Sequence, residues 1–150
     1  MEGSLGKWIS IIHRNLCAHM DRLFRESDIG HGPRRFLVEI ALSPGLTQEE
    51  VSERLLMDKT TTARAVKQLE QGEYITRTRD PFDRRRYVLE PTDKGRQLLP
   101  GVLEARRECH LALAEGFSEA ELEIILLMLK RMADNAVRLR GSTTTGSDRS

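Results

Sequence analysis

The chain contains few of the residues that define several common classes of protein. Its 150 residues include only two cysteines, Cys17 and Cys109, and 5% aromatic residues. Two distant cysteines cannot build the disulfide framework of a small secreted domain, so we expect free thiols in a reducing compartment. The sequence also lacks the roughly 18 consecutive apolar residues of a membrane span and the N-terminal pattern of a signal peptide. We therefore expect a cytoplasmic protein.

The chain has almost no net charge. It carries 24 Lys and Arg residues against 23 Asp and Glu residues, which gives a net charge of +1. The hydrophobic fraction of 39% is sufficient for one packed domain. A small net charge does not exclude a nucleic-acid partner, because affinity depends on where the charge is concentrated.

Apolar residues recur at helical spacing at both ends of the chain. Residues 7–26 form one predicted helix, and residues 92–140 form two more, with a bend expected at Pro100 and Gly101. A capping-box pair, Ser118 and Glu121, begins the last helix, which is apolar nearly all round. Such a helix needs burial on more than one side, and a second copy of the chain can supply it. We therefore expect dimerisation helices at about 7–26 and 92–140 in a homodimer.

Shorter helices are predicted between these ends. One begins at Pro33, a favoured first helical residue, and runs to residue 42. Thr47 and Glu50 form a capping-box pair that begins a second short helix. Asp58 is the predicted N-cap of a third, which Gly72 ends and in which the inward-facing residues are expected to be Ala63, Val66 and Leu69.

The periodicity changes after Gly72. Residues 74–78 and 86–89 favour extended structure, and residues 80–83 between them are rich in turn formers. Pro91 is expected to end the second strand. The predicted fold is mainly α with a small β-hairpin wing: a winged helix-turn-helix at about 33–91, within a single domain of residues 1–140. Residues 141–150 are expected to be a disordered tail, because they have nothing to bury.

Positive charge is concentrated in the third short helix and the hairpin. Four acidic residues, Glu70, Glu73, Asp80 and Asp83, lie in the same stretch. The eight basic residues are Lys59, Arg64, Lys67, Arg77, Arg79, Arg84, Arg85 and Arg86. Basic side chains on one helix and one hairpin can neutralise DNA phosphates. The alternative is a basic face that contacts only water.

The helix of residues 59–71 has the composition of a DNA recognition helix. Hydroxyl, amide and basic side chains can hydrogen-bond base edges in the major groove. The predicted DNA-binding residues of this region are Thr47, Gln48, Lys59, Thr60, Thr61, Thr62, Arg64, Lys67 and Gln68. Threonines in a first helical turn also serve as caps in purely structural helices. The prediction of DNA contact therefore depends on where these threonines lie, at the start of the second helix of a helix-turn-helix.

The hairpin tip places one carboxylate beside three guanidinium groups. Asp83 is expected to orient one arginine while the others project toward DNA. A narrow A·T-rich minor groove concentrates negative potential and attracts an inserted arginine. The predicted DNA-binding residues of the tip are Arg84, Arg85 and Arg86. An exposed loop with weak salt bridges is the alternative.

The sequence around the tip resembles a known family. The run Asp80-Pro81-Phe82-Asp83-Arg84-Arg85, followed by Leu89, Thr92 and Gly95, is similar to the wing signature of the MarR (multiple-antibiotic-resistance regulator) family. The resemblance covers about residues 7–140 and includes Gly-Glu-Tyr-Ile before the first wing strand. Pro91 departs from the leucine that usually precedes the threonine, which should affect only the end of the strand.

The resemblance implies a sequence-specific transcription regulator, most often a repressor, that binds palindromic double-stranded DNA as a homodimer. It implies that residues 59–71 enter the major groove and that Arg85 enters the minor groove. It also implies release of DNA by a small phenolic or aromatic carboxylate. The first-helix segment resembles salicylate-responsive archaeal-type members, and the candidate effector-binding residues are Lys7, Trp8, His13 and Arg14. Arg14 is the preferred anion anchor. No other cofactor and no metal are expected.

Two alternative functions compete with this one, and two others are not supported by the sequence. A winged helix can serve as a protein-interaction module that never contacts DNA. Cys17 could make the protein a thiol-based redox sensor, as in some relatives, although Tyr74 and Tyr87 lie far from it in sequence. The pairs His13–Cys17 and Cys109–His110 lack the spacing of a closed zinc site. No constellation typical of an enzyme is present, so an enzyme is not expected.

Overall fold

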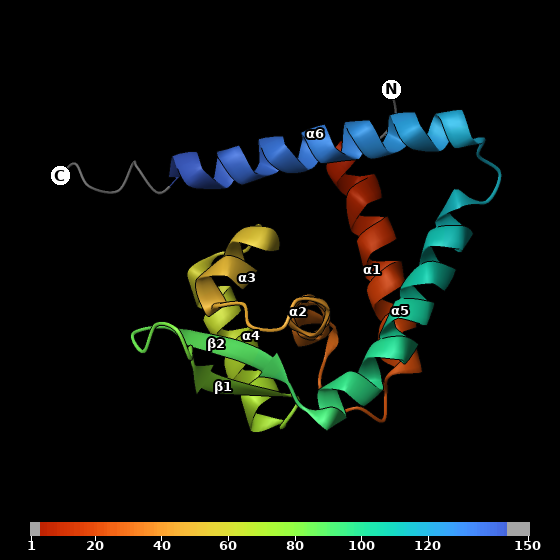
Figure 1. Ribbon diagram of the computed structural model, residues 1–150. Helices are drawn as coiled ribbons and strands as arrows, with labels where there is room; N and C mark the ends of the chain where they lie inside the picture. The colour runs from red at the N-terminus through yellow and green to blue at the C-terminus, as the bar shows by residue number, and fades with distance from the viewer. Residues whose placement is uncertain (1–3, 144–150) are drawn as a thin grey trace. The chain divides into compact units, whose positions relative to one another are not determined.

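The computed structural model describes residues 4–143 (Figure 1). Within this range the chain forms six helices and one two-stranded antiparallel sheet, which confirms the predicted fold class. The elements are α1 (Leu5–Leu23), α2 (His31–Leu42), α3 (Gln48–Arg54), α4 (Lys59–Gln71), β1 (Ile75–Arg79), β2 (Tyr87–Pro91), α5 (Asp93–Ala114) and α6 (Glu119–Thr143). No helix in residues 4–143 has the length and apolarity needed to cross a bilayer. The chain divides into two compact units, Met1–Cys109 and His110–Ser150.

The core of the first unit lies between α2, α3, α4 and the hairpin. Apolar side chains from all of these elements are almost completely buried there: Phe36, Leu37, Ile40, Val51, Val66, Leu69 and Leu89. The loop before α3 joins the sheet, because Leu46 forms a bridge with Leu89. The Leu89 N–H donates to the Leu46 carbonyl at 2.8 Å, and the Gly45 N–H donates to the Leu89 carbonyl at 3.0 Å. The second wing strand is therefore fixed to the helix-turn-helix by backbone hydrogen bonds.

The helix boundaries follow the predicted caps. Thr47 and Glu50 form a complete capping box at α3, and the Asp58 carboxylate accepts from the Thr61 N–H at 2.8 Å to cap α4. Leu56 adopts a positive φ of 51° in the tight turn between the two helices. Several boundaries differ from the prediction: α1 spans Leu5–Leu23 rather than about 7–26, α2 begins at His31, two residues before Pro33, and α6 extends to Thr143 rather than to about residue 140.

The inward face of α4 differs from the prediction by one residue at its start. Ala63 is exposed, whereas Thr62, Ala65, Val66 and Leu69 are buried. These buried positions follow the i, i+3, i+4, i+7 spacing of a helix face. The prediction for Ala63 was wrong because it assumed that a hydroxyl-bearing residue would face solvent. Thr62 satisfies its hydroxyl inside the helix by donating to the Asp58 carbonyl at 2.9 Å.

The first turn of α5 is joined closely to the start of the wing. The Thr92 N–H donates to the Tyr74 carbonyl at 3.0 Å, and the Thr92 hydroxyl donates to the Glu73 carbonyl at 2.6 Å. A Cβ atom built on Gly95 would lie 2.2 Å from the Tyr74 carbonyl oxygen. Only glycine allows this approach. The threonine and glycine of the wing signature thus have a packing role. The helix α5 itself continues through Pro100.

Two polar networks hold the loop between α1 and α2 in place. The buried Arg34 guanidinium donates to the Met20 carbonyl at 2.9 Å and pairs with Asp21. The Tyr74 hydroxyl donates to Asp28, which also pairs with Lys94 at 3.3 Å. Burial, together with this hydrogen bond to Asp28, raises the pKa of Tyr74 to about 12. The α1–α2 loop, the start of the wing and α5 are thereby connected.

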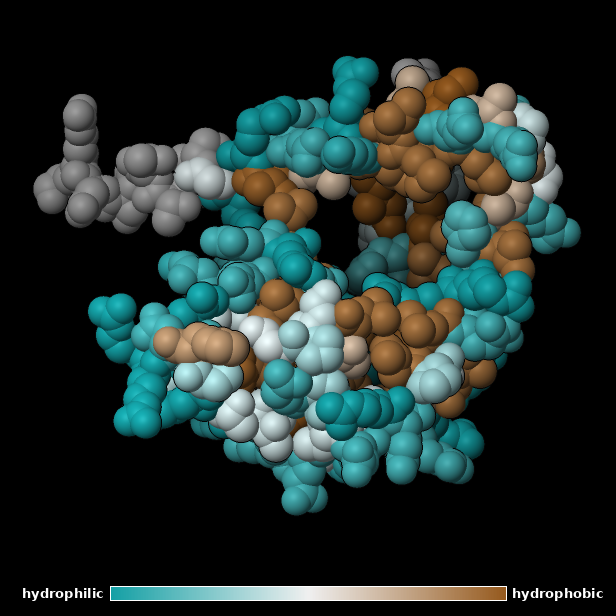
Figure 2. All heavy atoms as spheres, viewed as in Figure 1, coloured by the Kyte–Doolittle hydropathy of each residue, from teal (hydrophilic) through white to brown (hydrophobic). Residues whose placement is uncertain are grey.

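The second unit contains α6, which has no buried residue among those described. Ser118 and Glu121 form the predicted capping box: the Ser118 N–H donates to the Glu121 carboxylate at 2.8 Å, and the Glu121 N–H donates to the Ser118 hydroxyl at 3.3 Å. Large apolar side chains on α6 remain exposed, including Ile124, Leu126, Leu127, Met128 and Leu129. Figure 2 shows hydrophobic side chains, in brown, gathered on this helix. The helix continues to Thr143, three residues into the segment predicted as a disordered tail. Residues 144–150 of that segment lie outside the described range.

Candidate nucleic-acid interface

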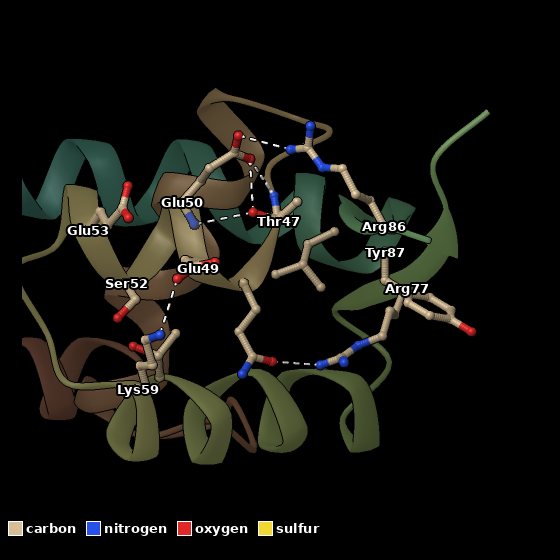
Figure 3. Close-up of a pocket in the computed structure, with 12 residues that line it drawn as sticks. Thr47, Glu49, Glu50, Ser52, Glu53, Lys59, Arg77, Arg86 and Tyr87 are labelled. Atoms are coloured by element: carbon tan, nitrogen blue, oxygen red, sulfur yellow. Dashed lines mark hydrogen bonds and ion pairs between the residues drawn. The ribbon is translucent and has the colours of Figure 1, made fainter. Parts of the chain in front are cut away.

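The starts of α3 and α4 and the strands of the wing surround an open cavity of about 650 Å³ (Figure 3). Its walls are made by charged and polar side chains from all three elements. They include Thr47, Gln48, Glu49, Glu50, Glu53, Lys59, Arg77, Arg86 and Tyr87. Acidic residues come from α3, and basic residues come from α4 and the wing. At this cavity the wing is joined to the helix-turn-helix by the Arg86–Glu50 ion pair and the hydrogen bond from Arg77 to Gln48.

The outward face of α4 carries most of the predicted recognition residues. Thr60, Arg64, Lys67 and Gln68 are exposed. Among the described residues, neither Arg64 nor Lys67 has an ion pair with a carboxylate. Their charges are consequently available to an external anion.

Two other residues of the first turn of α4 have partners within the chain. The Lys59 ammonium lies 3.1 Å from a Glu49 carboxylate oxygen, although its side chain is largely exposed. The Thr61 hydroxyl donates to the Asp58 carboxylate at 2.7 Å and is half-buried. Both side chains therefore have to exchange or share a partner in order to contact DNA.

The prediction that Thr62 contacts DNA is wrong. The side chain is fully buried, with 0% of its surface exposed, and it packs into the core between α4 and its neighbours. A residue without accessible surface cannot contact a base or a phosphate. Thr62 stabilises α4 instead.

Thr47 and Gln48 lie at the start of α3 and are both half-buried. The Thr47 hydroxyl donates to Glu50 at 3.0 Å within the capping box. The Gln48 side-chain carbonyl accepts from Arg77 at 2.7 Å. Arg77 also lies 3.6 Å from a carboxylate oxygen of Glu70 on α4. One arginine of β1 thus connects both helices of the helix-turn-helix.

Arg86, which directly precedes β2, connects the wing to α3. Its guanidinium lies 3.0 Å from a Glu50 carboxylate oxygen (Figure 3). Hydrogen bonds from Thr47 and the charge of Arg86 lower the pKa of Glu50 below its ordinary value. Glu50 therefore serves both the capping box and the wing, and the charge of Arg86 is partly neutralised by this pair rather than by an external anion.

The hairpin tip is built around two aspartates. The Asp80 carboxylate accepts from the Phe82 N–H at 2.8 Å, and the Asp83 carboxylate accepts from the Arg85 N–H at 3.0 Å. Asp83 also lies 3.3 Å from the Arg85 guanidinium, which agrees with the expectation that it orients one arginine. Arg84 is exposed and has no ion pair with another residue in the range 4–143. The Arg85 side chain is 92% exposed.

The residues that hold the wing to the helices could not be found from the sequence alone. Arg77 and Glu50 looked like a simple basic charge and a simple cap, because their partners come from other elements of the fold. Arg79 also has a local partner, since its guanidinium lies 5.6 Å from the centre of the Tyr87 ring. The alternation of arginine with threonine along β1 was the available signal for Arg77 and Arg79, but it does not identify their partners.

The four candidate effector residues are all exposed on α1. The Lys7 ammonium lies 5.4 Å from the centre of the Trp8 ring. Seven residues are about two helical turns, so Lys7 and Arg14 share one face of α1, whereas Trp8 and His13 point in other directions. His13 instead contacts the half-buried Cys17, with Nε2 3.5 Å from Sγ. The structure of the single chain therefore does not bring the four residues into one site.

Comparisons with known proteins agree with this fold. Residues 33–86 match a model described as MarR family. The uncharacterised regulator YybA of Bacillus subtilis is 34% identical over 131 residues, 87% of each chain. The repressor NicR of Pseudomonas putida is 27% identical over 89 residues, 59% of this chain and 56% of the relative.

One similar solved structure contains DNA. A Listeria monocytogenes protein assigned to the MarR family, crystallised with a 26-mer DNA, is 28% identical, with a TM-score of 0.85 over 99% of both chains. The helix-turn-helix, the hairpin wing and the exposed basic side chains define a winged helix-turn-helix DNA-binding protein.

This chain belongs to the MarR family of transcription regulators. It is a DNA-binding transcription regulator.

Proposed function

We propose that this regulator represses transcription by binding a palindromic duplex as a homodimer. The observation that carries the proposal is the arrangement of basic side chains without a carboxylate partner. Arg64 and Lys67 on α4 and Arg84 on the hairpin tip have no such partner among residues 4–143. Phosphate is the anion that matches cations spread over one helix and one protruding hairpin.

In the proposed complex the exposed face of α4 reads the major groove and the hairpin tip reaches the minor groove. Thr60, Arg64, Lys67 and Gln68 would contact base edges and flanking phosphates. Arg85, oriented by Asp83, would enter the minor groove, and Arg84 would contact phosphate. A protein bound in this way excludes polymerase from an overlapping promoter, and the relative NicR is itself named a repressor.

The homodimer is supported by exposed apolar surface on α1 and α6. Trp8 and Leu5 on α1 and the apolar residues of α6 named above are exposed in the single chain. A soluble monomer rarely keeps so much apolar surface in water, and a second copy of the chain would cover it. Sedimentation equilibrium tests this part directly: a mass of twice 17.1 kDa is expected, and a stable monomer would contradict it.

DNA recognition is tested by selecting bound duplexes from a random pool. The proposal predicts an imperfect palindrome whose half-sites lie about 10 to 10.5 base pairs apart, because two related α4 helices would enter successive major grooves. A single site without symmetry would contradict the dimeric mode. No salt-sensitive binding to any duplex would instead favour a winged helix that binds only proteins.

We further propose that a small aromatic carboxylate, such as salicylate, binds beside α1 and releases the DNA. Lys7 and Arg14 form a basic strip on one face of this helix, with Trp8 next to Lys7. Thermal-shift measurements with salicylate and related acids test it, since a ligand of the native state raises its melting temperature. The shift should be lost in Arg14→Ala and kept in Arg106→Ala, an exposed arginine elsewhere. An unchanged melting temperature of the wild-type protein with all of these acids would refute the proposed effector.

A further inference from the structure

The most exposed large apolar side chain in the described range belongs to the hairpin tip. Phe82 is 98% exposed, whereas the next most exposed, Leu139, is at 71%. The Phe82 ring therefore has essentially no contact with the rest of the chain. An aromatic side chain held entirely in water has an unfavourable hydration free energy that burial against a partner would recover.

The backbone around Phe82 is fixed by hydrogen bonds. The Asp80 carboxylate accepts from the N–H groups of Phe82 at 2.8 Å and Asp83 at 3.3 Å. The hairpin closes on either side, since the Asp80 N–H donates to the Arg86 carbonyl at 2.9 Å and the Arg86 N–H donates to the Asp83 carbonyl at 3.0 Å. Pro81 restricts the backbone directly before the ring. The tip is thus a turn held by hydrogen bonds, and the Phe82 side chain points outward from it.

The surroundings of Phe82 select the kind of partner. Arg84 and Arg85 follow it in the turn, and both are exposed. An apolar protein surface would bury the ring but would also desolvate these guanidinium groups without compensation. A DNA groove offers both requirements at once: phosphates for the arginines, and the apolar faces of deoxyribose and base edges for the ring.

We propose that Phe82 is an apolar DNA contact that packs against the sugar wall of the minor groove beside the inserted arginine. The inference rests on the proposed placement of the hairpin tip on DNA and adds a residue that charge alone does not reveal. Contact between a ring and a sugar releases no counterion, so its contribution to affinity is independent of salt. The arginines that follow it contribute in the opposite way, because each phosphate contact steepens the salt dependence.

The experiment measures DNA affinity over a salt series by fluorescence anisotropy, with a labelled duplex that carries the selected site. For Phe82→Ala the affinity should fall roughly five- to twentyfold at every salt concentration, the size expected for an exposed aromatic contact. The slope of log affinity against log salt should stay as in the wild type. Phe82→Leu should recover most of the affinity. The control Arg84→Ala should lower the slope by about 0.9 for each phosphate that the arginine no longer neutralises.

Because the Phe82 ring is 98% exposed and the substitutions keep the backbone hydrogen bond to Asp80, the melting temperature of the variants should equal that of the wild type. A second measurement places the ring directly: in a Trp8→Phe background, the tryptophan emission of F82W should change on addition of the duplex. Wild-type affinity in Phe82→Ala, or unchanged F82W emission at saturating duplex, would overturn the proposal. A changed oligomeric mass with unchanged DNA affinity would also overturn it, in favour of a protein partner. Failure of the wild-type protein to bind any duplex would instead refute the proposed function.

Discussion

The base and the tip of the wing differ in how their arginines are used. We call β1, β2 and their contacts with α3, α4 and α5 the wing base. There, Arg77 pairs with Glu70 and Arg86 pairs with Glu50. At the wing tip (residues 80–85), Arg84 has no carboxylate partner in the described range and Arg85 is bonded only to its neighbour Asp83. The same residue type thus positions the wing at one end and faces outward at the other.

This difference shows that counting charge overestimates the surface available to DNA. The basic residues between Lys59 and Arg86 looked equivalent in the sequence, yet Lys59, Arg77 and Arg86 each have an acidic partner from another element. Such exposed pairs contribute only about 0 to 1 kcal/mol each to stability. Their main effect is geometric, because they set the position of the hairpin against the helix-turn-helix.

The largest effect is expected at the root of the wing, from Gly95→Ala. In most helices this substitution stabilises by up to about 1 kcal/mol. Here the new Cβ would lie 2.2 Å from the Tyr74 carbonyl oxygen and 3.2 Å from Leu37 Cδ1, so one of the elements must move. We expect a net loss of about 2 kcal/mol in the free energy of unfolding, measured by urea denaturation. The control Gly141→Ala, which meets no atom within 4 Å, should not destabilise.

Glu50→Ala should have the next largest effect. It removes half of the α3 capping box and the partner of Arg86. We expect a loss of about 1 kcal/mol of stability. DNA affinity should also decrease, because the wing loses one of its attachments. Glu53→Ala, on the same helix but outside the capping box, is the matched control. Equal stability of the two variants would mean that the wing base is held by its backbone contacts alone.

A pair of threonines extends the comparison to α4. Thr62→Val should leave DNA affinity unchanged, because the side chain is fully buried and the Asp58 carbonyl keeps its bond from the Thr62 N–H at 3.0 Å. Thr60→Val removes an exposed hydroxyl and should weaken DNA binding about fivefold, within the range of single base contacts. Fluorescence anisotropy measures the DNA affinity of the two variants, and melting curves show whether either variant is destabilised. A larger DNA defect in the buried variant would contradict the division between inward and outward residues.

The smallest expected effect is a pH dependence of the wing base. The pKa of Glu50 is lowered in the folded protein, first by its hydrogen bond from the Thr47 N–H and then by Arg86. A lowered carboxyl pKa stabilises the fold above the ordinary value of 4.5, and this contribution disappears as the pH falls through the folded-state pKa. The stability difference between wild type and Glu50→Ala should therefore be constant near neutral pH and shrink below about pH 4.5. A difference that grows in acid would contradict the assignment.

Local signals in the sequence predicted most of the fold. The capping boxes at Thr47 and Ser118 and the cap at Asp58 fixed three helix starts, since each cap uses residues three positions apart. The turn chemistry of residues 80–83 located the wing tip. The predicted start of α2 was two residues late. The inward position of Ala63 was wrong, because tertiary packing can bury a threonine that satisfies its own hydroxyl.

The candidate site was less predictable than the fold. Which arginines remain without a carboxylate partner depends on contacts such as Arg86 with Glu50, 36 positions apart, and Arg77 with Gln48, 29 positions apart. No local pattern encodes such distances. The exposure of Phe82 was also invisible, because an aromatic residue in a turn packs inward as readily as it points outward.

The most direct test of the account compares the salt dependence of DNA binding in two variants. Arg84→Ala/Arg85→Ala should make the dependence of log affinity on log salt less steep by at least about 0.9 per wing, because the phosphate contact of Arg84 is lost together with the charge that Arg85 places in the minor groove. Arg86→Ala should leave the slope close to that of the wild type and lower the melting temperature instead. Equal slopes in the wild type and the double variant, or a greater loss of slope in Arg86→Ala, would contradict the division between a positioning base and a DNA-binding tip.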